Sequence, residues 1–431
     1  MSFRLFVKNL KQIVQIVDDN ETSFLKNEQM SQIKILNDPN AKLCIVVDSS
    51  GLISFVGSES EASKIIGNHQ IDNILDSKQG IAIPGFVDGH SHPVFAGDRV
   101  HEFAMKLAGA TYMEVQQMGG GIMFTTNKTR EASEDDLKND FLDVARKMLK
   151  NGTTTLEAKS GYGLDLDSEM KMLRVLSKAS EEIPLEISST FCGAHAVPKG
   201  STESEQTRLI CDEILPLISK EKSEGKLKNL ENIDVFCEKG VFEVESSRKI
   251  LLAGKSAGLH VNFHAEELKY IGGVEMGADI GARAMSHLEE ISDDGIRKMA
   301  ESGSVAVLLP STAFILRLTP PPARKMIEND VIVALGSDFN PNAYCLAMPM
   351  IMHFACVTMK LSMPEALVAA TLNSAHSLGR GKTHGAIAKG RHADIVVLEA
   401  NSWEHIIYRI AAHHDVIKNV VKNGNVVYSS A

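Results

Sequence analysis

Two histidines spaced two residues apart are the clearest chemical signal in the sequence. His90 and His92 lie in the segment Asp-Gly-His-Ser-His, directly after the apolar run 81–87. In an extended segment, residues i and i+2 point to the same face, so both imidazoles can bind one metal ion. An H-x-H pair also arises by chance, and its position after a predicted strand is what favours a metal site.

Two further residues can complete a ligand set with this pair. His264 follows the apolar run 259–263, and Asp338 follows the run 331–336 within Ser-Asp-Phe-Asn-Pro. Taken alone, the first could be a core histidine and the second a turn residue or helix cap. Together with His90 and His92 they supply three imidazoles and one carboxylate, which suits Zn²⁺ or iron. The sequence therefore predicts one metal site and leaves the metal open.

Titratable or polar residues also follow most of the other apolar runs. Burying so many polar groups costs free energy, which favours a functional role for them. They are Lys159 and Tyr162, His195, Glu238, Glu267 and His287. The sequence contains no Gly-x-Ser-x-Gly segment, so nucleophilic serine chemistry has little support.

The elements that must position these residues alternate along the middle of the chain. Eight apolar runs are candidate strands, at 81–87, 153–158, 185–191, 232–237, 259–263, 281–285, 304–309 and 331–336. Amphipathic stretches such as 134–152 and 167–182 are candidate helices between them. This alternation predicts an α/β fold, a (β/α)₈ TIM-type barrel over residues 81–384. Catalytic residues of such barrels gather at the carboxyl ends of the strands.

Both ends of the chain instead predict β-structure. The runs 43–47 and 52–57 flank a glycine turn, and the segment 418–429 contains an Asn423-Gly424 hairpin signal. A further strand is expected in 393–399. We therefore expect a small β-sandwich domain built from residues 1–80 and 385–431.

Composition and charge narrow the function classes. The 431-residue chain is 44% hydrophobic and 23% charged, with a net charge of −10. No Lys/Arg block suggests nucleic-acid binding, and no apolar run is long enough for a membrane span. The N-terminus lacks the pattern of a secretory signal. Six scattered cysteines read as reduced thiols, so we expect a cytoplasmic protein.

Several motifs carry a resemblance to a known group of enzymes. The chain resembles the amidohydrolase superfamily in Pro-Gly-Phe-Val-Asp-Gly-His-Ser-His (84–92), in the histidines at 264 and 287, and in the Gly-Ser-Asp-Phe-Asn-Pro segment at 336–341. Within it, the chain is similar to the animal-type branch of the imidazolonepropionase family. The more specific segments are GGGI (119–122), KSGYGL (159–164), CGAHAVP (192–198), FHAEE (263–267) and SHLEE (286–290).

The resemblance implies an activity and a site. The reaction would be hydrolysis of the ring C–N bond of 4-imidazolone-5-propanoate to N-formimidoyl-L-glutamate, in histidine degradation, by a metal-activated water. The resemblance assigns His90, His92, His264 and Asp338 to one zinc or iron ion, and it assigns Arg99, Tyr162, His195, Glu267 and Asn340 to the substrate. The planar fork of Arg99 suits the propionate carboxylate. By the same analogy we expect a homodimer.

Some points stay open at the level of sequence. Glu267, His287 and Asp338 are all candidates for moving protons. Asn342-Ala343 departs from the glycine followed by serine or threonine that many bacterial relatives have there, which puts two substrate contacts in doubt. Lys159 follows the wrong strand to bridge two metals, so one metal is favoured. Rival interpretations are a hydantoinase-like enzyme, a nucleobase deaminase, or a scaffold protein without activity.

Overall fold

An eight-stranded parallel sheet forms the centre of the chain. The structure, a computed structural model, describes residues 2–40, 42–109 and 120–430. Each strand pairs in parallel with the next along the chain. The strands are β8 (Phe86–Asp88), β9 (Thr153–Lys159), β10 (Glu186–Ala194), β11 (Leu230–Cys237), β12 (His260–Ala265), β13 (Ala284–His287), β14 (Val305–Leu308) and β15 (Ile332–Leu335).

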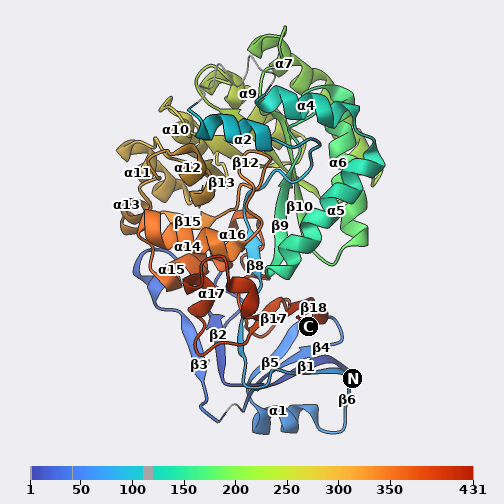
Figure 1. The fold of residues 1–431 in the computed structure, drawn as a ribbon, viewed down its shortest axis with the longest axis vertical. Helices are drawn as coiled ribbons and strands as arrows, with labels where there is room; N and C mark the ends of the chain where they lie inside the picture. The colour runs from blue at the N-terminus through green and yellow to red at the C-terminus, as the bar shows by residue number, and fades with distance from the viewer. Residues whose placement is uncertain (1, 41, 110–119, 431) are drawn as a thin grey trace.

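The first and last strands of this sheet meet and nearly close it into a barrel. The backbone N–H of Gly89 donates to the carbonyl of Leu335 over 3.2 Å, and Ser91 pairs in parallel with Phe339. The (β/α)₈ barrel expected from the alternation of runs is confirmed (Figure 1). Seven of the predicted strands lie within a few residues of the observed ones, since their apolar side chains are buried on both faces of the sheet.

Helices surround the barrel (Figure 1). The two helices predicted from amphipathic spacing are α5 (Glu134–Lys150) and α6 (Leu166–Glu182), and the side chains of Ser133 and Asp165 cap their first turns. The remaining helices of this part are α2 (Val100–Leu107), α4 (Ile122–Glu131), α7 (Glu203–Leu209), η2 (Ile210–Ile214), α8 (Leu215–Ser223), α9 (Val244–Ser256), α10 (Gly273–Asp279), α11 (Asp293–Ser302), α12 (Pro310–Leu316), α13 (Ala323–Glu328), α14 (Met348–Met359), α15 (Met363–Ala369) and α16 (Leu372–Ser377).

Two further sheets are built from the chain ends. The four-stranded sheet has the order β5 (Ile53–Ser58), β4 (Leu43–Asp48), β1 (Ser2–Leu10) and β6 (Gln70–Asp76). The six-stranded sheet has the order β18 (Asn425–Ser429), β17 (Ile417–Lys422), β16 (Ile395–Leu398), β7 (Ile81–Pro84), β2 (Gln12–Ile16) and β3 (Lys34–Asn37). The short elements α1 (Glu59–Ile66), η1 (Asn27–Ser31), α17 (His405–Tyr408) and η3 (His413–Asp415) complete these parts.

The two terminal sheets pack face to face as the expected sandwich. Buried side chains from both ends of the chain form one shared core, including Leu5 and Ile45 from the first sheet and Ile395 and Val397 from the second. The predicted hairpins are β4 with β5 and β17 with β18. Both termini therefore contribute to one β-structure below the barrel (Figure 1). The division at residues 80/81 and 384/385 stays a prediction.

The apolar run 81–87 is not the single barrel strand that its pattern predicts. It forms two strands: β7 pairs with β16 and β2 in the terminal sheet, and β8 pairs with β9 in the barrel. Gly85 separates them, and a Cβ at this position would lie 2.4 Å from Oγ1 of Thr154. Hydropathy cannot reveal this change of sheet, because both strands are buried on both faces.

One buried arginine ties the N-terminal segment to the link that follows the barrel. Arg391 is fully buried, and its guanidinium donates to the carbonyls of Asp19, Gly381 and His384 at 2.9, 2.7 and 2.9 Å, as well as to that of Thr22. Such a planar cation with several donors can satisfy carbonyls from separate segments at once. Among the residues that the structure describes, no helix has the length and apolarity needed to cross a membrane.

Candidate metal centre and active site

The four predicted metal ligands meet at the carboxyl ends of the barrel strands. Nε2 of His92 lies 3.1 Å from Nε2 of His264. Oδ1 of Asp338 lies 3.5 Å from Nε2 of His90 and 3.7 Å from Nε2 of His92. All four side chains are buried. Segments far apart in the sequence thus bring three imidazoles and one carboxylate to a single point.

The donor set fits a metal ion. Nε2 of His90 is buried with no hydrogen-bond partner in the described part of the chain, and two imidazole nitrogens 3.1 Å apart cannot both carry a hydrogen between them. In the described ranges, the ligand atoms of His90, His92 and His264 lie within 4.8 Å of one another, as do those of His90, His287 and Asp338. Ring nitrogens turned toward a shared cation explain both features.

Partners on the outer side of two of the predicted ligands, His264 and His90, fix their orientation. Nδ1 of His264 lies 2.8 Å from Oδ1 of Asp234, and Nδ1 of His90 lies 2.8 Å from the hydroxyl of Ser286. A hydrogen on Nδ1 leaves the lone pair of Nε2 facing the centre. The sequence-based prediction missed Asp234. An acidic residue inside the apolar run of β11 was the available signal, because a buried carboxylate needs a partner.

Lys159 lies beneath the ligands as part of an ion-pair cluster. Its Nζ lies 2.7 Å from Oε1 of Glu157 and 2.7 Å from Oδ2 of Asp234, and all three side chains are buried. Burial alone would lower the pKa of Lys159, but the two carboxylates raise it. The lysine is therefore a charged partner of Asp234. Glu238, also singled out at a strand end, accepts backbone N–H groups of Leu268 and Lys269, and so it shapes the loop after β12.

Glu267 and His287 form a coupled pair beside the ligands. Nε2 of His287 lies 3.7 Å from Oε2 of Glu267, and its Nδ1 lies 3.6 Å from Oε2 of Glu289. Burial raises the pKa of Glu267 to about 7, although His287 opposes this shift. Burial lowers the pKa of His287, but the two carboxylates outweigh it and raise the value. A carboxyl group with a pKa near neutrality can both accept and donate a proton.

Backbone strain also gathers at this point. His287 and Asp338 have φ angles of +76° and +47°, in the left-handed region that side chains with a Cβ rarely adopt. The fold holds Asp338 there through a hydrogen bond from its N–H to the carbonyl of His90 at 2.8 Å. Its Oδ2 accepts from the Thr312 hydroxyl over 2.5 Å. Such strained residues cluster at functional sites, where the surrounding structure compensates for their cost.

A cavity of about 120 Å³ is lined by three of the four predicted ligands, His92, His264 and Asp338. The residues that the family resemblance assigns to substrate all line it, and they are Arg99, Tyr162, His195, Glu267 and Asn340. His195 stacks on His92 with ring centroids 4.6 Å apart, and its Nδ1 lies 2.9 Å from the carbonyl of Gly161. Burial lowers the pKa of His195 to about 4, so this ring is neutral near pH 7.

The loop after β15 contains Asn342 and Ala343, which differ from the residues of many bacterial relatives, together with Asn340. Asn340 uses both ends of its amide on this loop: Nδ2 donates to the carbonyl of Asp338 at 2.7 Å, and Oδ1 accepts from the N–H groups of Asn342 and Ala343 at 2.7 and 3.1 Å. Asn342 lines the cavity with its neighbours. Ala343 is fully buried. In this conformation Asn340 therefore shapes the loop, and Asn342 is presented to the cavity.

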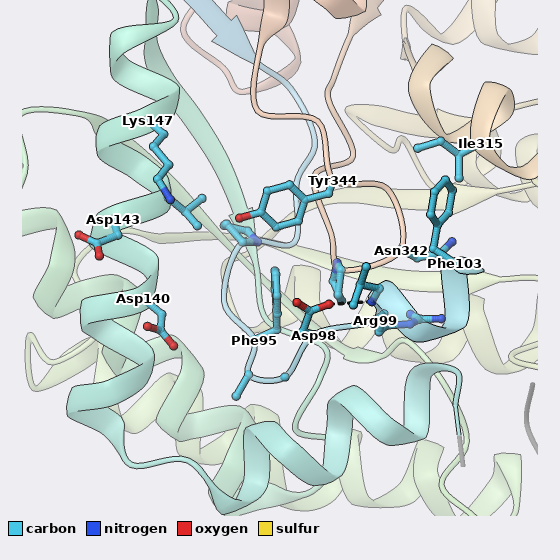
Figure 2. Close-up of a pocket in the computed structure, with 16 residues that line it drawn as sticks. Phe95, Asp98, Arg99, Phe103, Asp140, Asp143, Lys147, Ile315, Asn342 and Tyr344 are labelled. Atoms are coloured by element: carbon cyan, nitrogen blue, oxygen red, sulfur yellow. Dashed lines mark hydrogen bonds between the residues drawn. The ribbon is translucent and has the colours of Figure 1, made fainter. Parts of the chain in front are cut away.

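A larger groove of about 700 Å³ lies next to this cavity (Figure 2). Phe95, Phe103, Lys147 and Tyr344 line it, and it shares Arg99 and Asn342 with the smaller cavity. Of the glycine run at 119–121, Gly119 lies outside the described residues, and the N–H of Gly121 donates to Glu102 at 2.8 Å.

The chain forms a (β/α)₈ barrel whose strand ends present three histidines and an aspartate. This fold and this candidate metal centre place it in the class of hydrolase-type barrels. The amidohydrolase family model matches residues 81–427. The chain belongs to the amidohydrolase family.

Relatives that match over nearly the full length carry one name. The chain is 51% identical to a probable imidazolonepropionase from Nematostella vectensis over 426 residues, covering 99% of each chain. It is 50% identical to one from Danio rerio, covering 100% of this chain and 98% of the relative. It is 47% identical to one from Homo sapiens, covering 99% of each chain.

Solved structures share the fold at much lower identity. A guanine deaminase from C. acetobutylicum with bound guanine superposes with a TM-score of 0.70 at 18% identity, covering 99% of this chain and 100% of the other. A triazine hydrolase variant superposes with a TM-score of 0.73 at 16% identity, covering 99% and 94%. At these identities the likeness concerns the fold alone.

Proposed function

We propose that the chain is an imidazolonepropionase, which hydrolyses the ring C–N bond of 4-imidazolone-5-propanoate and releases N-formimidoyl-L-glutamate. The observation that carries this proposal is the full-length similarity to relatives of that name, at 47–51% identity. The site supports it, since Arg99 lies in the same small cavity as the candidate metal ligands. A guanidinium fork there matches a carboxylate substituent on the substrate.

One metal ion, zinc or iron, is proposed to bind His90, His92, His264 and Asp338. When bound, such an ion lowers the pKa of a coordinated water and polarises the carbonyl that is to be attacked. The ion pairs of Lys159 support a single ion. Lys159 is held as a charged partner of Glu157 and Asp234 at 2.7 Å, and a bridging carbamate would require a neutral lysine amine. Elemental analysis showing two metal equivalents per chain would contradict this proposal.

The remaining residues of the cavity are proposed to bind the substrate and to move protons. Arg99 binds the propionate, while the rings of Tyr162 and His195, which line the same cavity, orient the substrate ring. The proton that leaves water and the one that reaches the departing ring nitrogen need a carrier beside the reacting atoms. Glu267 is the first candidate because the pKa of its carboxyl is raised to about 7, with His287 and Asp338 as alternatives.

The oligomeric state, the location and the domain division of the protein are also proposed. We propose a homodimer by family analogy, and a cytoplasmic location because the substrate is a small metabolite and the six cysteines are free. We also keep the division into a composite domain of residues 1–80 and 385–431 and a barrel of residues 81–384. Limited proteolysis that cuts near residues 80 and 385 would support this division.

Substrate turnover tests the function directly. The purified protein, loaded with zinc or iron, is incubated with 4-imidazolone-5-propanoate, a hydantoin or guanine, and the products are identified by mass spectrometry. We expect N-formimidoyl-L-glutamate from the first and no turnover of the others. Turnover of guanine or the hydantoin instead would favour another member of the family. A folded, metal-loaded protein with no hydrolase activity would favour a scaffold.

A further inference from the structure

A cluster of charged side chains lies at the mouth of the substrate cavity. Glu102, on α2, accepts from Nε of Arg99 at 2.8 Å and also from its Nη2. It is paired with Nζ of Lys106 at 2.7 Å and accepts the N–H of Gly121 at 2.8 Å. Burial alone would raise the pKa of Glu102, but the hydrogen bonds from these donors lower it to about 2. Two cations around one carboxylate leave a net positive charge.

Lys106 reaches from this cluster to the loop after β15. Its Nζ donates to Oδ1 of Asn342 over 2.6 Å. An ammonium group can only donate, so this contact fixes which end of the Asn342 amide faces the lysine. The amide nitrogen, Nδ2, is then a hydrogen-bond donor on the other side of the side chain. Asn342 lines both the small cavity and the neighbouring groove, as Arg99 does (Figure 2).

We propose that Asn342 binds the carboxylate of the substrate through Nδ2, beside Arg99, and that Glu102 and Lys106 are the positioning residues that orient these two donors. The identity of that carboxylate, the propionate of the imidazolone, rests on the proposed function. Glu102 holds one edge of the Arg99 guanidinium, leaving the rest of the fork for a ligand. A carboxylate has two oxygens and about four acceptor positions, so one partly used guanidinium does not satisfy it.

The neighbouring residues of the same loop are poorer candidates for this contact. Asn340 uses its amide on backbone groups of the loop, and Ala343 is buried and has no polar side chain. The Glu102–Lys106–Asn342 chain therefore makes Asn342 a specificity residue for an anionic substrate.

The test compares an acid with its neutral amide as probes. Binding of 3-(imidazol-4-yl)propanoate and of the corresponding carboxamide to the metal-loaded protein is measured by calorimetry. In Lys106→Met the aliphatic stem stays while the ammonium is lost. We expect about a 10-fold weaker affinity for the acid, the size of a lost hydrogen bond to a charged group, and less than about a 3-fold change for the amide. Equal weakening of both probes would overturn the proposal.

Two further variants distinguish the orientation of the Asn342 amide from a general electrostatic attraction of the anionic probe. Lys147→Met removes the same charge from the neighbouring groove, where the lysine is exposed on α5. It should leave both affinities unchanged. Asn342→Asp keeps the shape but replaces the donor with an anionic oxygen, and we expect a loss for the acid at least as large as in Lys106→Met. An unchanged acid affinity in Asn342→Asp, or an equal loss in Lys147→Met, would contradict a specific contact.

Turnover distinguishes this inference from the proposed function. With the imidazolone as substrate, Lys106→Met should raise KM about 10-fold and change kcat less than about 3-fold, because the carboxylate contact is made equally before and during reaction. A wild-type protein that turns over the imidazolone while Lys106→Met keeps its KM refutes the inference alone. A wild-type protein with no turnover refutes the function, and the acid and amide probes still decide whether the anion site exists.

Discussion

The hydrogen bond between Asp234 and His264 decides which ring nitrogen faces the proposed metal centre. Asp234 accepts from both the backbone N–H and the ring Nδ1 of His264, at 3.0 and 2.8 Å, and Lys159 holds its second oxygen. A ligand whose tautomer is fixed in advance loses less freedom when a metal binds. The three buried charged groups below the centre, Glu157, Lys159 and Asp234, thus act through the histidine.

Asp234→Asn should therefore weaken metal binding. The amide keeps the shape but loses the charge that favours a hydrogen on Nδ1, so metal affinity should fall about 10- to 100-fold. Metal content after dialysis against a chelator at fixed free metal measures this change. Glu238→Gln is the matched control, since Glu238 is also a buried carboxylate at a strand end but contacts only loop backbone. An unchanged metal content in Asp234→Asn would remove Asp234 from this role.

Glu267→Gln should reduce kcat by about 100-fold or more if Glu267 moves the proton. The wild-type rate should also depend on this carboxyl group. Its pKa is raised to about 7, and a base must be deprotonated, so kcat/KM should fall as the pH is lowered through about 7. We expect this fall in kcat/KM at low pH to be absent in Glu267→Gln. Rate profiles of both proteins between pH about 5.5 and about 9 test this. Normal turnover by Glu267→Gln would transfer the role to His287 or Asp338.

At the scale of elements, Arg391 connects the N-terminal segment, through Asp19 and Thr22, to the segment that follows the barrel, through Gly381 and His384. Arg391→Met would leave the buried carbonyls of Gly381 and His384, and the partly buried carbonyl of Asp19, without their donor. We expect the free energy of unfolding to fall by about 3 kcal/mol or more, as for other buried groups that lose their partner. Urea unfolding measures it. Arg146→Met, at an exposed i,i+3 ion pair with Asp143, should change it by less than about 0.5 kcal/mol.

The sequence predicts helices and strands well where a hydropathy pattern is compatible with only one structure. The barrel strands and the helices α5 and α6 follow from buried apolar runs and amphipathic spacing, and the strand-end histidines follow from the barrel topology. The prediction of a single barrel strand at 81–87 is wrong, because a buried strand has the same hydropathy pattern in either sheet. Glu102 and Lys106 could not be singled out, since charged residues on a helix are usually exposed and only the fold turns Glu102 inward.

At the scale of the whole molecule, an exposed apolar face offers a surface for the proposed homodimer. Phe314 on α12, Val357 on α14 and Tyr408 on α17 are 60%, 67% and 69% exposed. Of these helices, α14 packs against both α12 and α17 (Figure 1). Exposed apolar patches of this kind often mark protein–protein interfaces.

We therefore expect the wild-type protein to have twice the 46.9 kDa mass of one chain in light scattering after gel filtration. Val357→Glu should shift it toward the monomer, since a charge buried in a dimer interface without a partner is costly. Leu252→Glu, at an exposed leucine on α9, is the control that introduces the same charge. A wild-type monomer would contradict the dimer, and a dimer unaffected by Val357→Glu would place the interface elsewhere.

Because β7 pairs with β16, near the opposite end of the chain, the terminal sandwich cannot be completed until almost the whole chain has left the ribosome. His90 and His92 emerge early, but β7 lacks its partner β16 until the C-terminal strands arrive. Contacts so distant in sequence form slowly, and an open strand edge invites aggregation in the meantime. We expect nascent chains that end before β16 to depend on chaperones. The C-terminal strands thus help to complete the fold around a candidate metal centre to which they contribute no ligand.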